Sequence, residues 1–240
     1  MGIYRLTLPD KRIILNNIML VKEITQGYTY DIAKLQSALG GEQSRKEIAT
    51  IVRKFAQEQT GERIKVTTHS APQVDSGSMN LGAYYDPEND EDEEGHIIEL
   101  QLAFSPKDKT LKWSEEGKRY FVNELADVLK HEMLHAQQHR SRDFHPGRVG
   151  YDQRDLNYEY MTRPDEIEAY AMNIADELVR KAGKDGALEL LRMAGKTAQF
   201  KDEMGNFLSP NLMAYFAMFD WRAEHPVMKR LLKRIYQFIN

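Results

Sequence analysis

The sequence contains no cysteine in its 240 residues. This absence excludes disulfide bonds, thiolate nucleophiles and cysteine zinc sites, so any bound metal ion must be held by histidine and carboxylate side chains. It is also typical of a cytoplasmic protein, because stable disulfides belong to oxidising compartments.

Long apolar runs are missing as well. The longest one near the N-terminus, residues 13–21, is interrupted by Asn16 and Asn17 and is far too short to span a bilayer. The chain does not begin with a basic segment followed by an apolar one. We therefore expect no signal peptide and no membrane association.

Basic residues are not in excess over acidic ones. The chain has 33 basic and 37 acidic residues and a net charge of −4, which does not indicate the basic surface that nucleic-acid binding needs. A nucleic-acid partner is therefore not expected. Hydrophobic residues make up 41% and charged residues 29%, a composition typical of a globular protein with a substantial core.

The apolar pattern predicts an α+β fold in one domain, residues 1–240, with a mixed part over 1–113 and a mainly helical part over 114–240. Apolar residues at three- and four-residue steps predict a helix over 44–59, with Ser44 as its N-cap and Gly61 at its end. Alternating apolar and polar residues predict strands at 63–68, 81–85 and 97–104.

Helices are expected over most of the remaining chain. One long amphipathic pattern covers 114–140 and another helix covers 164–181, with an irregular polar stretch between them to about Tyr160. Of three later helical stretches, two begin with a proline in the first turn, at Pro210 and Pro226.

The acidic segment 86–95, DPENDEDEEG, lies between two of the expected strands. Charge runs of this kind usually form a solvated surface, so we expect an acidic hairpin tip. A calcium loop is the alternative, but the segment lacks the ligand spacing of an EF-hand. We therefore reject calcium binding there.

Residues 131–135 read HEMLH, which matches the H-E-x-x-H pattern. Residues four apart lie on the same face of a helix, so His131 and His135 can bind one ion, while Glu132 projects about 100° away and can address a water molecule. The histidine face also carries Glu124, Asp127 and Gln138, and the opposite face is apolar. The pattern therefore predicts a zinc site with His131 and His135 as ligands and Glu132 as general base.

A catalytic zinc site needs a third protein ligand. The metzincin pattern would place a histidine at position 141, which is Ser141, so that class is excluded. The segment RPDEIEAYAMNIADEL, residues 163–178, resembles the gluzincin metallopeptidases. The resemblance implies that Glu166, followed three residues later by Ala169, is the third ligand.

Three other residues stay open as the third ligand. Glu168 is also followed by a small residue at the required distance, but it lies nearer the apolar side of its helix. His139 and His145 are alternatives because HEMLHA also resembles the SprT-like proteases, whose third histidine lies downstream. The resemblances cover about 114–181, under a third of the chain.

The gluzincin resemblance implies a zincin-like fold and a Zn²⁺-dependent peptidase acting on a protein or peptide. A sheet would pack on the active-site helix, and the strand HIIELQLAF would be the edge that pairs with extended substrate. Four tyrosines are candidates for stabilising the oxyanion: Tyr151, Tyr158, Tyr160 and Tyr170.

The chain is also similar to small zincin-like proteins encoded by bacteriophages, which implies an infected bacterial cytoplasm or a virion as its location. The alternative function is therefore a non-catalytic structural or binding protein, such as a virion component, on a zincin scaffold.

Overall fold

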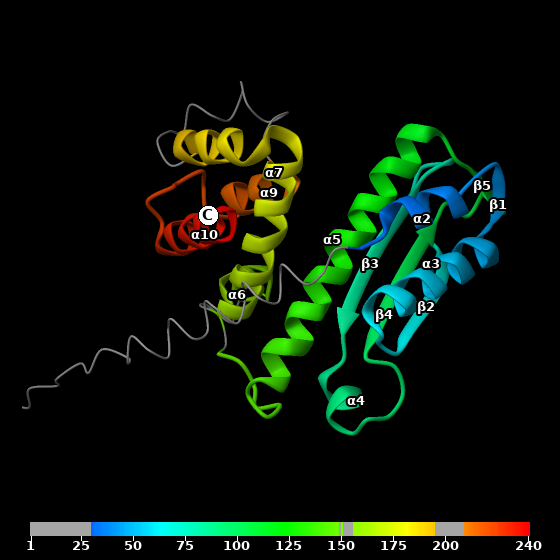
Figure 1. Ribbon diagram of the computed structural model, residues 1–240, viewed down its shortest axis with the longest axis horizontal. Coiled ribbons are helices and arrows are strands. Elements are labelled where there is room, and N and C mark those ends of the chain that lie inside the picture. Colours follow the sequence, from blue (N-terminus) through cyan, green and yellow to red (C-terminus); the bar gives the residue numbers. More distant parts are fainter. Residues whose placement is uncertain (1–29, 149, 151–155, 195–208) are drawn as a thin grey trace, which may run out of the picture.

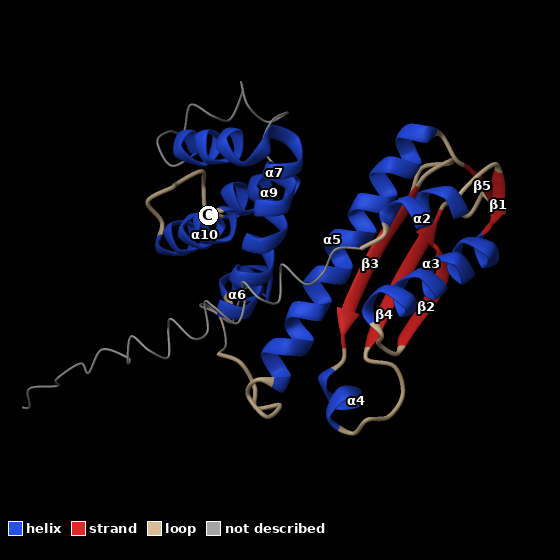
Figure 2. Cartoon of the chain, viewed as in Figure 1, coloured by secondary structure: helices blue, strands red, loops and turns tan. Residues whose placement is uncertain are grey.

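The computed structural model describes residues 30–148, 150, 156–194 and 209–240 (Figure 1). The apolar segment 13–21 lies outside the described residues. Over the described part, all strands precede helix α5 and every later element is a helix (Figure 2). The α+β class expected from the sequence is confirmed.

The elements match most of the predicted helices and strands. Their bounds, in chain order, are α2 Ile32–Ala38, β1 Glu42–Ser44, α3 Arg45–Thr60, β2 Ile64–Ser70, β3 Met79–Tyr85, α4 Pro87–Glu91, β4 Ile98–Phe104, β5 Thr110–Lys112, α5 Glu115–Arg140, α6 Leu156–Thr162, α7 Pro164–Ala194, α9 Pro210–Met218 and α10 Pro226–Ile239.

Local sequence signals set the ends of α3. The side chain of Ser44 accepts a hydrogen bond from the backbone of Glu47, and the Glu47 side chain accepts one in return, which forms a capping box. Gly61 ends the helix in the left-handed conformation, with φ of 72°, which glycine adopts without steric cost. The predicted cap residues at both ends are confirmed.

The main sheet has the strand order β2-β4-β3, with β4 parallel to β2 and antiparallel to β3. The prediction that HIIELQLAF forms the edge strand was therefore wrong. Six of the seven residues of β4 are buried, as expected for a strand with a neighbour on each side. The edge nearest α5 is β3, whose alternate residues Asn80, Gly82 and Tyr84 are exposed.

Helices cover one face of this sheet. Ile98, Leu100, Leu102 and Phe104 share a hydrophobic core with residues of α2, α3 and α5. The neighbouring Glu99 instead forms a salt bridge with Lys65, with Nζ and Oε2 at 2.8 Å. Alternation of side chains along β4 therefore divides the sheet into an apolar face under the helices and a polar face.

A second hydrophobic core lies on the other side of α5. It is built by α7, α9 and α10, with Ile174, Tyr215 and Leu231 among its buried members. Figure 1 shows α5 between this helical part and the sheet. Helix α5 therefore has the sheet along one side and the helical part along the other. Its polar face lies at the junction of these two parts.

The acidic segment 86–95 differs in part from the expected hairpin tip. Residues 91–95 are exposed, as expected, but Pro87–Glu91 form helix α4. Asp90 is buried, accepts hydrogen bonds from Arg140 Nε and Nη2 at 2.8 Å, and accepts another from the Tyr85 hydroxyl at 2.8 Å. This carboxylate therefore connects the end of α5 to the sheet.

Helix α6 was not expected from the sequence, because it lies in the stretch read as irregular, where a short polar segment gives little periodic signal. Helix α7 runs to Ala194, but Gly183 interrupts it with φ of 69° and ψ of 175°. This break lies two residues after the predicted end of the helix at 181, and the part beyond it corresponds to the first of the three later helical stretches. In the part of the chain that is described, no helix is long and apolar enough to cross a membrane.

Candidate metal centre

The histidine pair and Glu166 come together between α5 and α7. The Nε2 atoms of His131 and His135 lie 3.1 Å apart. Each also lies 3.4 Å from one oxygen of the Glu166 carboxylate. All three side chains are buried, and among the described residues they form a group whose ligand atoms lie within 4.8 Å of one another.

These separations fit one small cation. Nitrogen and oxygen atoms bound at about 2.0–2.1 Å to a single tetrahedral zinc ion lie roughly 3.3 Å apart. The Nε2 pair and the two nitrogen–oxygen distances fall close to that spacing. Glu166 Oε2 is buried without a hydrogen-bond partner among the described residues, although burying such an atom is costly. The donor set therefore suits a divalent metal ion.

Both histidines have an amide side chain next to the ring nitrogen that faces away from Glu166. His135 Nδ1 lies 3.0 Å from Gln138 Oε1, and His131 Nδ1 lies 3.5 Å from Asn173 Nδ2. A proton on Nδ1 leaves Nε2 free to act as a ligand. The amide of Gln138 therefore favours the tautomer of His135 that binds a metal ion through Nε2.

The electrostatics of Glu166 also favour cation binding. Burial by itself raises the pKa of this carboxyl, but its interactions with His131 and His135 outweigh burial and bring the pKa below its ordinary value. For His135, burial lowers the pKa, and interactions with Glu166 and Glu132 overcome this and raise the pKa to about 8. Glu166 is therefore ionised at neutral pH, the form that binds a metal ion.

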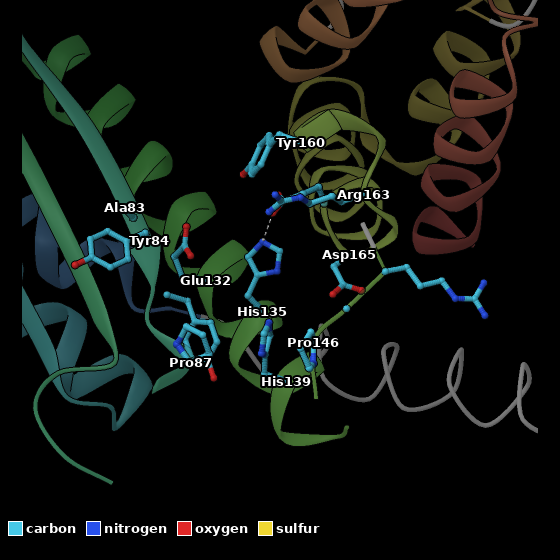
Figure 3. Close-up of a pocket in the computed structure, with 14 residues that line it drawn as sticks. Ala83, Tyr84, Pro87, Glu132, His135, His139, Pro146, Tyr160, Arg163 and Asp165 are labelled. Atoms are coloured by element: carbon cyan, nitrogen blue, oxygen red, sulfur yellow. Dashed lines mark ion pairs between the residues drawn. The ribbon is translucent and has the colours of Figure 1, made fainter. Parts of the chain in front are cut away.

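Glu132 lies beside the three clustered residues without belonging to the group. Its side chain is buried, and burial raises its pKa, while the nearby backbone of Tyr85 on strand β3 acts in the opposite direction. In Figure 3, Glu132 and His135 project from α5, with Tyr84 on the strand side and Asp165 on the helix side. The Glu132 carboxylate therefore lies between the edge of the sheet and the histidine pair.

The other candidate ligands lie elsewhere. The Glu168 carboxylate is 3.5 Å from Arg234 of α10, on a different side of α7 from Glu166. His145 is exposed, and its Nδ1 lies 3.0 Å from the backbone oxygen of Asp143. His139 packs its ring against Tyr85 at a centroid distance of 5.4 Å. The structure therefore brings Glu166 to the histidine pair and none of these three.

Two of the four candidate tyrosines lie at the site. The ring of Tyr170 contacts that of His131 edge-on at 4.9 Å, and the pKa of Tyr160 is raised, mainly by burial and then by its proximity to Glu166. Tyr158 instead packs on Phe219 in the helical core. Tyr151 lies outside the described residues.

A cavity of about 510 Å³ opens beside His131, His135 and Glu166, and we call it the His135 cavity. Its walls come from β3, α5, α6 and the start of α7, and Figure 3 shows the side chains around it. The lining residues used below are Ala83, Glu132, His135, Tyr160 and Glu166. The cluster is therefore accessible to a molecule larger than water.

Sequence reasoning identified the histidines and Glu166 but did not assign the residues that support them. Gln138 and Asn173 were visible as polar residues on the correct helix faces, which was the available signal. The contribution of β3 had no such signal, because strand order follows from tertiary pairing. Comparison of the chain with protein-family models, curated proteins and solved structures gives no match.

Proposed function

We propose that this chain is a zinc-dependent peptidase with a zincin-like fold. His131, His135 and Glu166 would hold the ion, and Glu132 would be the general base. The observation that carries the proposal is the convergence of two Nε2 atoms and a carboxylate with a separate buried glutamate beside them. Two ligands and a base at H-E-x-x-H spacing, with a third ligand from another helix, suit metal-assisted hydrolysis.

The edge of β3 that pairs with no other strand in the described part of the chain supports a peptide as the substrate. Asp86 donates a backbone hydrogen bond to Ile97 at 2.8 Å, so alternation along the antiparallel ladder directs the backbone groups of Leu81, Ala83 and Tyr85 away from β4. The backbone of Tyr85 lowers the pKa of Glu132, which agrees with this direction. An extended peptide pairing with Leu81 and Ala83 would pass directly by Glu132.

The residues of the chain then divide the chemistry. Zinc would polarise the scissile carbonyl and make a water molecule more acidic. Glu132 takes the proton of the attacking water and delivers it to the leaving amine, and burial raises its pKa toward the range that suits such transfer. Tyr160 and Tyr170, which line the adjoining cavity with their rings 6.5 Å apart, would donate hydroxyl hydrogen bonds to negative charge that develops on the substrate oxygen.

Metal analysis and a cleavage assay on the full chain test the proposal. We expect about one zinc per chain after reconstitution, severe loss of zinc in His131→Ala and His135→Ala, and cleavage of members of a peptide library by the wild type. His69→Ala is the matched control, since this histidine is on strand β2 away from the cluster.

Two results would contradict the proposal in different ways. A wild-type protein that takes up no zinc has no metal centre of this kind. A protein that binds zinc in the expected ratio but cleaves no peptide would instead support a non-catalytic structural or binding role for the same scaffold.

A further inference from the structure

A smaller cavity is lined by residues of β3, α5, α6, α7 and α9. We call it the Glu177 cavity; it has a volume of about 220 Å³. It shares Ala83, Glu132 and Tyr160 with the His135 cavity. A whole ligand site usually measures roughly 300–1,000 Å³, so this space suits a single side chain of a substrate bound at the metal centre.

Three carboxylates besides Glu132 line this cavity: Glu124 and Asp127 from α5, and Glu177 from α7. Arg180 donates a hydrogen bond to each oxygen of Asp127, so this carboxylate already has a cationic partner. Burial raises the pKa of Glu124, which shows that its ionised form is not fully compensated by nearby positive charge. The cavity therefore favours a bound cation.

The second observation is that polar atoms in the cavity lack partners. Glu177 is 8% exposed and accepts a hydrogen bond from Asn211 on Oε1 at 3.1 Å, whereas Oε2 is buried without a hydrogen-bond partner among the described residues. The Oδ1 atom of Asn173, which is 5% exposed, is buried in the same way. Two unpartnered acceptors in one cavity match a donor with several N–H groups.

From this geometry, and resting on the proposed function, we infer that the Glu177 cavity binds a lysine or arginine side chain of the peptide substrate, next to the bond that is cleaved. The ammonium or guanidinium group would donate to Glu177 Oε2 and Asn173 Oδ1, with Glu124 supplying further negative charge. The cavity thus makes Glu177 a specificity-determining residue.

A side chain fits the surroundings better than a chain terminus. A third cavity, of about 570 Å³, continues along β3 from the Glu177 cavity and shares Leu81 and Glu124 with it. Trp113 and Tyr120 also line this third cavity. A peptide paired with β3 can therefore extend in both directions from the Glu177 cavity. If the cavity held the N-terminal ammonium group of the peptide instead, the peptide would extend in one direction only.

The test uses zinc-loaded full-length protein and matched peptides that carry lysine, arginine, glutamine or norleucine at each position around the cleaved bond. We expect lysine or arginine at one position to raise kcat/KM by about 10- to 100-fold, as expected for a charge-assisted hydrogen bond. Glu177→Gln should abolish this preference, so that lysine and arginine peptides are cleaved no faster than glutamine and norleucine peptides. Acetylated and free N-termini should behave alike; a preference that requires the free amine would overturn the side-chain assignment.

Glu189→Gln is the control, because it removes the same charge from an exposed position of α7. It should retain the preference for basic peptides. Glu124→Gln provides a second variant of the cavity, and should reduce the preference in the same direction. Cleavage without any preference for basic residues, or a preference that both cavity variants retain, would overturn the inference while leaving the peptidase proposal intact.

Binding separates the two proposals if no peptide is cleaved. The same peptides, labelled with a fluorophore, are titrated into Glu132→Gln protein and into the double variant that also carries Glu177→Gln. Tighter binding of lysine or arginine peptides that disappears in the double variant supports the cavity assignment even if hydrolysis fails. Equal binding of basic and neutral peptides overturns it.

Discussion

Asn173 of α7 places its side-chain amide 3.5 Å from Nδ1 of His131 on α5. Its oxygen, Oδ1, is buried without a hydrogen-bond partner among the described residues. The amide therefore lies against the ring of His131 and helps to fix the orientation of that ring. One residue of α7 therefore orients a ligand that comes from α5.

We expect Asn173→Ala to weaken zinc affinity by about 10- to 100-fold, the usual cost of losing a residue that orients a metal-binding histidine. Competition with a chelator of known affinity measures this change. Asn123→Ala is the control, because that amide donates to Arg119 within α5 and should leave affinity unchanged. Equal affinity of Asn173→Ala and wild type would show that His131 needs no support from α7.

The third ligand is tested by paired variants on one helix. Glu166→Ala should lose zinc, because Glu166 supplies the only carboxylate in the described cluster with the two histidines. Glu168→Ala should keep zinc and lose some stability, since its carboxylate lies 3.5 Å from Arg234. Elemental analysis of both proteins, with His145→Ala beside them, measures zinc retention. Zinc loss from His145→Ala with retention by Glu166→Ala would contradict the assignment.

Glu132→Gln separates metal binding from catalysis. The amide has nearly the shape of the carboxylate but cannot take a proton from water, so hydrolysis should fall below detection while zinc content stays at the wild-type level. Zinc analysis and peptide cleavage on the same preparation test this. Peptide cleavage at the wild-type rate by this variant would show that another group is the base.

Glu177 should make stability depend on pH. Burial, assisted by repulsion from Asp127, raises its pKa to about 7 against the opposing effects of Ser209, Lys181 and Arg180. The folded state therefore binds this proton more tightly than the unfolded state. The resulting stabilisation is complete below pH of about 4.5 and disappears as the pH rises through about 7.

Replacing this group with glutamine removes the titration. The free energy of unfolding of Glu177→Gln minus that of wild type should be about 2–3 kcal/mol larger at pH 8.5 than at pH 5. Urea unfolding of both proteins at the two pH values measures the difference. The same difference between variant and wild type at both pH values would contradict the raised pKa.

Much of the candidate site follows from local sequence. His131 and His135 share a helix face because of their spacing, and the apolar residues opposite them determine which way the helix packs. Ser44, Gly61 and Ser114 act through contacts within a few residues of the chain, so the ends of their helices could be predicted without the fold.

Tertiary structure decided how those segments meet. The strand order could not be predicted from the sequence, because β3 and β4 have similar apolar content. Only their pairing makes β4 the central strand and β3 the edge next to Glu132. The choice of Glu166 over Glu168 likewise depends on how α7 is rotated against α5. Residues two apart on a helix point about 200° apart, so packing can bring only one of them to the histidine pair. Spacing along one helix therefore determined two of the proposed ligands and the proposed base, and the packing of a second helix and a strand determined the rest.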